Sequence, residues 1–329
     1  MKIAILGCGV AGLSAARELR RHGHDVSLFD KSRGVGGRMS TRYAGERDAG
    51  ERDTGEWEFD HGAQFFTAQD PDFKAAIDEA IAAGCAAPWP ANALYLDGEG
   101  SVSPDKGRAR YVGLPRMNSL PKYWAKDFDI SLGRRVTKIT KSKTWTLTFE
   151  DSGAATGFDA VICTLPPAQA KLILPKSFPH IDKVKSAKMH ACFCLMVGLE
   201  TAIDPGWATL RAKNLPIDWL AINHAKPGRS KSAGTVVVHS EAGWSDAHAE
   251  ADRDWIQEIM IKTASALIGY PLGTAPHIAL HRWLYASSQI SPNAPCLASD
   301  GLVVAGDWCL GGRVQGAWLS GRATAKALL

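Results

Sequence analysis

Three glycines near the N-terminus have the spacing of a phosphate-binding turn. Gly7, Gly9 and Gly12 follow the apolar run Lys2–Leu6 and open a segment with helical periodicity. In this pattern the first glycine allows a tight turn, the second lets the backbone approach a pyrophosphate, and the third lets the helix pack closely on the strand. The free N–H groups at the start of the helix then hold the anion. The motif therefore predicts a dinucleotide site.

An acidic residue and a second glycine turn extend this motif. Asp30 follows the apolar run Val26–Phe29, and a carboxylate roughly 20 residues after the glycines binds ribose hydroxyls in dinucleotide sites. Gly36, Gly37 and Arg38 then form a second glycine-rich turn. That turn would place a guanidinium near the same pyrophosphate, where a bidentate contact is favourable. These residues alone do not distinguish NAD from FAD.

The elements that must position these residues alternate between strand and helix. The apolar run before the first glycines, the helix after them and the strand before Asp30 form a βαβ unit, which implies a parallel sheet. Segments 159–163 and 301–306 predict further buried strands, and 314–328 predicts a closing helix. Nucleotide-type strands thus occur at both ends of the chain. A nucleotide domain that is interrupted by a second domain explains this order.

The composition is that of a globular protein. The chain has 329 residues, 45% of them hydrophobic and 22% charged, which fits about two domains. The net charge of +4 is too small to imply a nucleic-acid partner, and no apolar run approaches the roughly 18 residues of a membrane span. The seven cysteines form no C-x-x-C pair, which indicates free thiols in a cytoplasmic protein. The sequence also lacks a metal-binding cluster and a hydrolase triad.

Two segments stand apart from this pattern. The residues 44–48 and 49–53 repeat the same five letters, and we interpret this duplication as an exposed loop insertion. Between Lys106 and Lys143 the chain is strongly basic. This stretch is either a solvated face or a field that draws in an anionic ligand.

The C-terminal region adds a further nucleotide motif. Val303–Asp307 ends in Gly306-Asp307, and the glycine-rich segment Gly312–Gly321 follows. With the two N-terminal turns, this region resembles the FAD-binding amine-oxidase superfamily. The resemblance implies that Gly306 and Asp307 bind the ribityl chain and pyrophosphate of FAD. It also implies that the next helix starts under the flavin ring, where its dipole would stabilise the anionic reduced flavin.

Segments along the whole chain are similar to those of bacterial renalase-like proteins. They are Phe29–Met39, Gly62–Ala68, Asp218–Ala221, His281–Ala286, Gly306–Cys309 and Gly312–Gly321. This resemblance implies a FAD-dependent oxidase of the 2- and 6-dihydro isomers of NAD(P)H. Hydride would pass to flavin N5, and O2 would then take the electrons to give H2O2. The duplicated loop is longer than the resemblance leads us to expect.

We therefore predict an α/β protein with a doubly wound, FAD-binding Rossmann-type domain and an inserted α+β substrate domain. The FAD-binding domain is expected to comprise residues 1–66, 104–166 and 297–329. The substrate domain is expected to comprise 67–103 and 167–296, with a mixed or antiparallel sheet. We expect the FAD to be bound non-covalently, because no matched motif supplies a cysteine or histidine at the flavin methyl group. Cys309, close to Gly306 and Asp307, is the cysteine to test for such an attachment.

The motifs and the resemblance together give a set of cofactor contacts. Val136 is included because it matches the superfamily position whose backbone meets the adenine, although an ordinary strand valine is the alternative. The expected contacts are Gly7, Gly9, Val10, Ala11, Gly12, Asp30, Lys31, Gly37, Arg38, Met39, Ala63, Gln64, Val136, Gly306, Asp307, Arg313, Val314 and Gln315.

Candidate substrate contacts come from the middle of the chain. By resemblance, Asp60–Gln64 runs along the flavin, so Gln64 would contact the ring or the substrate. His281, Trp283 and Tyr285 share one strand face by period two and would form a wall for a flat nicotinamide ring, unless they only pack the core.

Three more residues have polar side chains that would suit the substrate site. His239 and Asn223 would hold the carboxamide or ribose of a substrate, unless they are ordinary polar core residues. Lys188 resembles the lysine that many amine oxidases place near flavin N5.

Three hypotheses for function follow from these residues. The first is the oxidase of dihydronicotinamide isomers, with a dinucleotide and O2 as its small-molecule partners and neither nucleic acid nor membrane involved. The second is an amine or other small-molecule flavin oxidase. The third is a FAD-containing binding protein without turnover. Hydride transfer from a dihydropyridine needs no strong base, so the absence of an obvious acid–base pair fits the first. The oligomeric state stays open.

Overall fold

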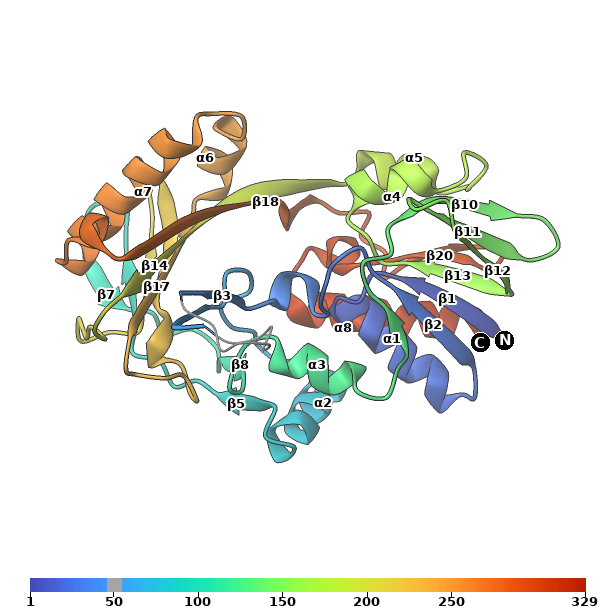
Figure 1. Ribbon diagram of the computed structural model, residues 1–329, viewed down its shortest axis with the longest axis horizontal. Coiled ribbons are helices and arrows are strands. Elements are labelled where there is room, and N and C mark those ends of the chain that lie inside the picture. The colour runs from blue at the N-terminus through green and yellow to red at the C-terminus, as the bar shows by residue number, and fades with distance from the viewer. Residues whose placement is uncertain (46–54) are drawn as a thin grey trace.

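The computed structural model describes residues 1–45 and 55–329, arranged around two main sheets (Figure 1). Most of the duplicated segment predicted as an exposed insertion lies outside these residues. The glycine motifs belong to the first sheet, on the right in Figure 1, and the candidate substrate residues belong largely to the second.

The first sheet has six strands in the order β19-β20-β13-β1-β2-β9. All neighbouring strands are parallel except β19 and β20. Strands from the start and the end of the chain therefore share one sheet, as the repeated nucleotide motifs predicted. The strands are β1 (Lys2–Leu6), β2 (Asp25–Phe29), β9 (Ile130–Ser131), β13 (Ala160–Cys163), β19 (Leu297–Ser299) and β20 (Leu302–Val304).

Different elements cover the two faces of this sheet. Ile3 and Ile5 pack on one face with the helices α1 (Val10–Arg21) and α8 (Val314–Leu328). Ala4 and Leu6 point to the other face, which a three-stranded antiparallel sheet covers. This alternation is the period-two pattern of a strand that is buried on both sides. The covering strands are β10 (Val136–Lys141), β11 (Trp145–Phe149) and β12 (Ala154–Phe158).

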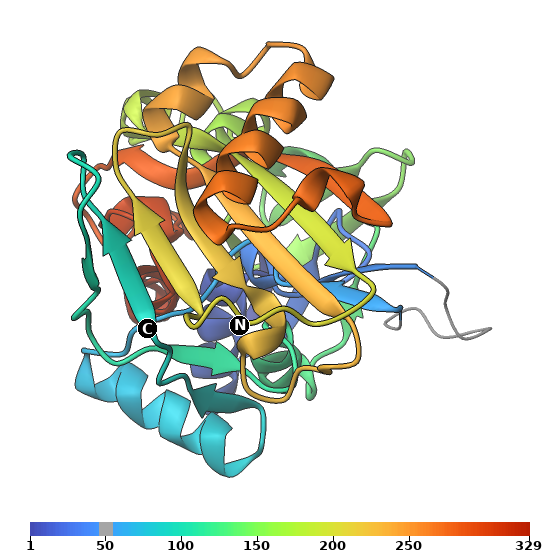
Figure 2. The same cartoon turned by 90° about the vertical axis from the view of Figure 1, so that its left-hand side faces the viewer.

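The second sheet has seven strands in the order β18-β14-β17-β16-β15-β6-β7. It is antiparallel except for the parallel pair β15 and β6, so it is mixed, as expected. The helices α6 (Ala242–Ala247) and α7 (Arg253–Ile268) cover its outer face (Figure 2). Its strands are β6 (Ala93–Leu96), β7 (Val102–Pro104), β14 (Lys188–Leu199), β15 (Thr209–Ala212), β16 (Ile217–Ile222), β17 (Gly234–Ser240) and β18 (His277–Ile290).

Two long strands and one hairpin connect the halves of the molecule. β14 and β18 run from the first half into the second (Figure 1). The hairpin of β3 (Arg42–Ala44) and β4 (Trp57–Phe59) packs on the second sheet, where Trp57 Nε1 donates to the carbonyl of Leu199 at 3.0 Å. The segment after this hairpin is therefore held between the two sheets. We keep the proposed domain boundaries as a prediction.

The remaining elements are short connections around these sheets. They are α2 (Pro71–Ala82), α3 (Ser119–Ala125), α4 (Pro167–Ile173) and α5 (Ile181–Ser186), the strands β5 (Ala86–Pro88) and β8 (Tyr111–Gly113), and the 3-10 turns η1 (Gly37–Met39), η2 (Asn223–Ala225), η3 (Leu272–Thr274) and η4 (Asp307–Leu310).

Candidate active site

The first glycine turn leaves open room at its centre. Gly7 has a φ of +99°, and a Cβ on Gly12 would lie 1.9 Å from the Gly7 carbonyl oxygen, so both positions require glycine. A Cβ on Gly9 would meet no described atom within 4 Å. This free space lies beside the first turn of α1, where N–H groups are available for an anion. The turn therefore fits a pyrophosphate.

The second glycine turn packs on the first and positions Arg38. The N–H of Gly36 donates to the carbonyl of Cys8 at 2.9 Å. Arg38 makes a bidentate ion pair with Asp307, with N–O distances of 2.8 and 2.5 Å, and donates to the Ala286 carbonyl at 3.0 Å. The Arg38 side chain is 31% exposed. Two predicted cofactor contacts from opposite ends of the chain thus meet beside the glycine turns.

Asp30 lies at the end of β2 and touches both neighbouring turns. Its carboxylate accepts from the N–H of Cys8 at 2.7 Å and from that of Ser32 at 2.8 Å. Its own carbonyl accepts from the N–H of Arg134 at 2.8 Å, which brings the start of β10 close. Val136, the first residue of β10, is buried and pairs with Phe149.

The remaining predicted cofactor contacts surround these turns. Gly306 has a φ of +154° and precedes η4, and Arg313, with a φ of +72°, precedes the first residue of α8, Val314. The side chain of Gln315 instead accepts from the N–H groups of Gln69 and Asp70, which ties α8 to α2. Val10, Ala11 and Met39 are buried, Ala63 is half-buried, and Lys31 is exposed.

The segment Asp60–Gln64, called the flavin-side segment below, lies against the second glycine turn. The N–H of Ala63 donates to the carbonyl of Arg38 at 2.8 Å. A Cβ on Gly62 would lie 2.0 Å from the same oxygen, so this contact requires glycine. The segment is thereby fixed beside the residues that would hold FAD.

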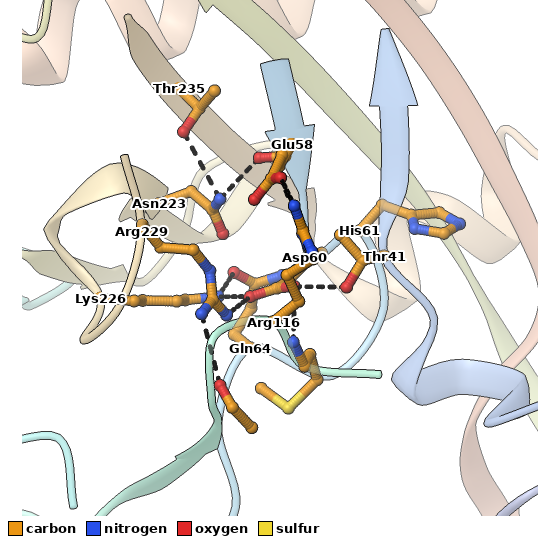
Figure 3. Close-up of polar contacts among 12 residues, drawn as sticks. Thr41, Glu58, Asp60, His61, Gln64, Arg116, Asn223, Lys226, Arg229 and Thr235 are labelled. Atoms are coloured by element: carbon orange, nitrogen blue, oxygen red, sulfur yellow. Dashed lines mark hydrogen bonds and ion pairs between the residues drawn. The ribbon is translucent and has the colours of Figure 1, made fainter. Parts of the chain in front are cut away.

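A fully buried charge cluster anchors the other side of this segment (Figure 3). The Asp60 carboxylate accepts from Lys226 Nζ at 3.1 Å, from Arg229 Nη2 at 2.5 Å and from the Thr41 hydroxyl at 2.8 Å. The side chains of Asp60 and Lys226 are 0% exposed. We call Asp60, Lys226 and Arg229 the Asp60 cluster.

The charges of the cluster shift one another's pKa values. Burial alone would raise the pKa of Asp60, but Lys226 and Arg229 outweigh it and hold that pKa well below its usual range. Burial lowers the pKa of Lys226 to about 8, and Arg229 adds to this effect while Asp60 opposes it. The cluster therefore holds an ionised carboxylate and a lysine that can lose its proton near physiological pH.

The side chain of Gln64 is used within the cluster. Its Oε1 accepts from Lys226 Nζ at 3.3 Å, and its Nε2 donates to the carbonyls of Asp60 and Gly62. Gln64 is buried. The Gln64 amide thus folds back on its own segment and helps to hold the segment's backbone in place. The predicted contact of Gln64 with the flavin ring or substrate stays a prediction.

An aromatic group lies next to the flavin-side segment. The carbonyl of His61 accepts from His239 Nε2 at 3.2 Å and from Trp283 Nε1 at 2.9 Å. The imidazole of His61, which points away from the cluster in Figure 3, stacks on Trp283 with ring centroids 5.0 Å apart. His281 meets the His61 ring edge-on at 5.1 Å. Two of the three aromatic residues predicted from β18 are therefore brought together here.

These histidines are uncharged at neutral pH. Burial lowers the pKa of His61 to about 3 and that of His239 to about 4. Burial also lowers the pKa of His281, and the nearby Arg42 adds to the effect. The group is therefore a neutral surface of two stacked rings, His61 and Trp283, with His281 edge-on to both, rather than a set of charged acid–base catalysts.

Three other predicted substrate-site residues, Tyr285, Asn223 and Lys188, do not join the aromatic group. The register between β14 and β18 shifts between His190 and Cys192, so the alternation that put Tyr285 on the face of Trp283 is interrupted. Asn223 is 1% exposed and donates to the Glu58 carbonyl at 2.9 Å, which favours a structural role. Lys188 lies exposed at the start of β14.

Sequence reasoning missed His61, Lys226 and Arg229. His61 lies inside Asp60–Gln64, the segment expected to run along the flavin, so its position in the sequence could have identified it as a candidate. Lys226 and Arg229 flank Pro227 and Gly228, a pattern typical of an exposed turn. Their burial depends on contacts with Asp60, 166 and 169 residues earlier, that no local pattern indicates.

Comparison with known families divides the chain in two. Residues 5–80 match the NAD(P)-binding Rossmann-like domain, and residues 85–329 match the flavin containing amine oxidoreductase family. The 4,4'-diapophytoene desaturase (4,4'-diaponeurosporene-forming) of Staphylococcus aureus (strain Newman) is 52% identical over 40 residues. That match covers 12% of this chain and only 8% of the desaturase.

Several solved structures share the whole fold at low identity. A putative protoporphyrinogen oxidase from Exiguobacterium sp. 255-15 has a TM-score of 0.75 at 12% identity, with 99% of this chain and 98% of that chain covered. Cyclohexylamine oxidase from Brevibacterium oxydans IH-35A has a TM-score of 0.74 at 13% identity, with the same coverage of both chains. Reduced UDP-galactopyranose mutase has a TM-score of 0.77 at 12% identity, with 99% of this chain and 93% of that chain covered. These matches confirm the predicted fold class, and the mutase among them shows that the fold alone does not define the reaction.

Among the residues that the structure describes, no helix combines the length and apolar character needed to cross a membrane.

Proposed function

Because this chain belongs to the flavin containing amine oxidoreductase family and has FAD as its cofactor, we propose that it oxidises the 2- and 6-dihydro isomers of NAD(P)H to NAD(P)+. Bound FAD would supply the hydride acceptor for the dihydropyridine ring, and O2 with a solvent proton would reoxidise it to give H2O2. The observation that carries this proposal is the neutral aromatic group of His61, His281 and Trp283 beside the flavin-side segment.

The cofactor would be held by the glycine turns and by the charged pair beside them. Gly9 gives the pyrophosphate its space, Asp30 takes ribose hydroxyls, and Arg38 shares its guanidinium between Asp307 and the phosphates. When bound, FAD supplies the hydride acceptor and the two-electron chemistry.

The aromatic group would hold the substrate ring. The rings of Trp283 and His61 give a flat nicotinamide ring a stacking surface, and their neutrality avoids repulsion of the pyridinium that is formed on oxidation. A dihydropyridine releases hydride without first losing a proton, so the site needs no general base. The role of the chain is then to orient the two rings and exclude water.

An amine substrate is the second candidate, and it is supported by the names of two structures that share the fold. These are putrescine oxidase and cyclohexylamine oxidase, each at 12 or 13% identity. We favour the dihydronicotinamide because motifs from Phe29 to Gly321 resemble renalase-like proteins. The exposed position of Lys188 gives the amine hypothesis no further support.

A donor panel in air tests the proposal. The purified flavoprotein is given 2- and 6-dihydro-NAD, putrescine and cyclohexylamine, and H2O2 is measured against product. We expect one H2O2 per NAD+ with the dihydronicotinamides and none with the amines. H2O2 formed only with the amines supports the second candidate, and no turnover with any donor supports a binding protein without turnover.

A further inference from the structure

The Asp60 cluster contains more positive than negative charge. Its described charged members are one carboxylate and two cations, and all three side chains are at most 2% exposed. The other titratable groups near Lys226 are Cys194 on β14 and His239 on β17. Burial raises the pKa of the Cys194 thiol and lowers the pKa of His239, so both are uncharged at neutral pH. Among the described residues no second carboxylate pairs with Lys226 or Arg229, and Lys226 Nζ lies 5.6 Å from the centroid of the Trp89 ring, whose face offsets only part of its charge.

This charge lies directly behind the flavin-side segment. Lys226 Nζ touches Asp60 and Gln64, the first and last residues of that segment. The middle of the segment rests on the backbone of Arg38 in the second glycine turn. The segment is thus clamped between the cofactor-binding turn and the buried cations.

We propose that Lys226 is a positioning residue of the flavin site and that its ammonium favours the reduced, negatively charged form of the cofactor. The inference needs only the FAD of the family, so it does not depend on which donor reduces the flavin. A buried charge acts over several ångströms because little water screens it. Burial of an unbalanced cation is costly, and a negative charge formed nearby offsets that cost.

The proposal predicts opposite effects from two neutralising substitutions. Lys226→Met removes a positive charge, so the midpoint potential of the flavin falls and the ratio of reduced to oxidised flavin at a fixed potential drops roughly tenfold. Asp60→Asn removes the negative charge, so the potential rises when it is measured at a pH low enough for the Lys226 ammonium of the variant to stay protonated. A merely structural role would not give shifts of opposite sign. The control is Lys185→Met, which removes an exposed lysine that is paired with Asp182 and leaves the potential unchanged.

The measurement is anaerobic photoreduction of the purified flavoprotein in the presence of a dye of known potential, which requires no substrate. An unchanged potential in Lys226→Met, or shifts of the same sign in both variants, would overturn the proposal. FAD affinity of the apoproteins is measured alongside, since a positioning role also predicts weaker binding in Lys226→Met.

The wild-type protein provides a second test should a variant fail to fold. Below about pH 8 Lys226 is already charged, whereas above it reduction of the flavin draws one solvent proton onto Lys226 Nζ. The potential should therefore depend more steeply on pH above about pH 8 than below it. A constant slope between pH 7 and 9.5 would overturn the proposal.

Discussion

Two of the arginine–aspartate pairs among the described residues use the same chemistry in opposite settings. Arg38 and Asp307 lie beside open space at the glycine turns, with the arginine 31% exposed. Arg229 and Asp60 are at most 2% exposed and are enclosed by protein. The first pair can share its guanidinium with an incoming phosphate. The second cannot exchange partners, so it shapes the site rather than binding the ligand.

The two pairs differ in what their charges contribute: Arg38 is placed to bind a ligand, whereas Arg229 and Asp60 stabilise the fold. An exposed ion pair adds little to stability, because water and salt screen it. A buried pair is strongly destabilising when one partner is lost. Substitutions in the two regions should therefore separate FAD affinity from the free energy of unfolding.

The largest effect is expected at the open end, from Gly9→Val. The backbone at Gly9 has a φ of −78°, which valine tolerates, and no described atom would clash with its Cβ. The apoprotein should fold normally, while the side chain fills the space of the pyrophosphate and abolishes FAD binding. Flavin absorbance and circular dichroism of the purified variant measure both effects. Normal flavin content would contradict the assigned phosphate site.

Gly12→Val is the matched comparison for that substitution. Its Cβ would lie 1.9 Å from the carbonyl oxygen of Gly7, so this variant should lose the fold as well as the flavin. A stable Gly12→Val protein would show that the turn has another shape.

The next largest effect is expected in the enclosed region, from Asp60→Asn. The two buried cations lose the one carboxylate that pairs with them among the described residues, which should cost about 3–5 kcal/mol in the free energy of unfolding. Urea denaturation of the apoprotein measures this cost. Asp151→Asn, which breaks the exposed pair with Arg134, is the control and should cost no more than about 1 kcal/mol. Equal costs in the two variants would remove the distinction between the regions.

A smaller effect is expected from Arg38→Ala, and it should appear in binding. Loss of the charge-assisted contact should weaken FAD binding by roughly 1.5–3 kcal/mol. It should also destabilise the apoprotein, by less than Asp60→Asn does, because the Asp307 side chain is 7% exposed and loses its partner. Titration of apoprotein with FAD measures the affinity. Lys185→Ala, which removes an exposed lysine paired with Asp182, is the control with unchanged affinity. If Arg38→Ala binds FAD as tightly as the wild type does, the pyrophosphate of FAD does not contact Arg38.

The smallest effect concerns pH and two histidines, His61 and His239. The folded-state pKa values of His61 and His239 are lowered to about 3 and 4, so the unfolded chain binds more protons in weak acid. Their contribution to stability is present above pH 6.5 and is lost as the pH falls toward 4. Urea denaturation should give a shallower pH slope in this window for His239→Asn than for the wild type. Identical slopes would mean that His239 does not titrate in this way.

The open region could be predicted from the sequence because its residues are close together in local motifs. Gly7, Gly9, Gly12 and Asp30 lie within one βαβ unit, and each has a conformational or charge requirement that its type reveals. The enclosed region depends on contacts between residues far apart, such as Asp60 with Lys226. The irregular register of β18 is likewise invisible to period-two reasoning, which is why the position of Tyr285 was not predictable.

The rate at which dihydronicotinamide isomers reduce the flavin tests the central claim most directly. Oxidised protein is mixed anaerobically with the 2-, 4- or 6-dihydro isomer of NAD, and loss of flavin absorbance is followed. The account predicts fast bleaching by the 2- and 6-dihydro isomers. It predicts slow bleaching by the 4-dihydro isomer, because its hydride sits on a different ring carbon and misses the near-attack geometry. Faster reduction by the 4-dihydro isomer than by both others would contradict it.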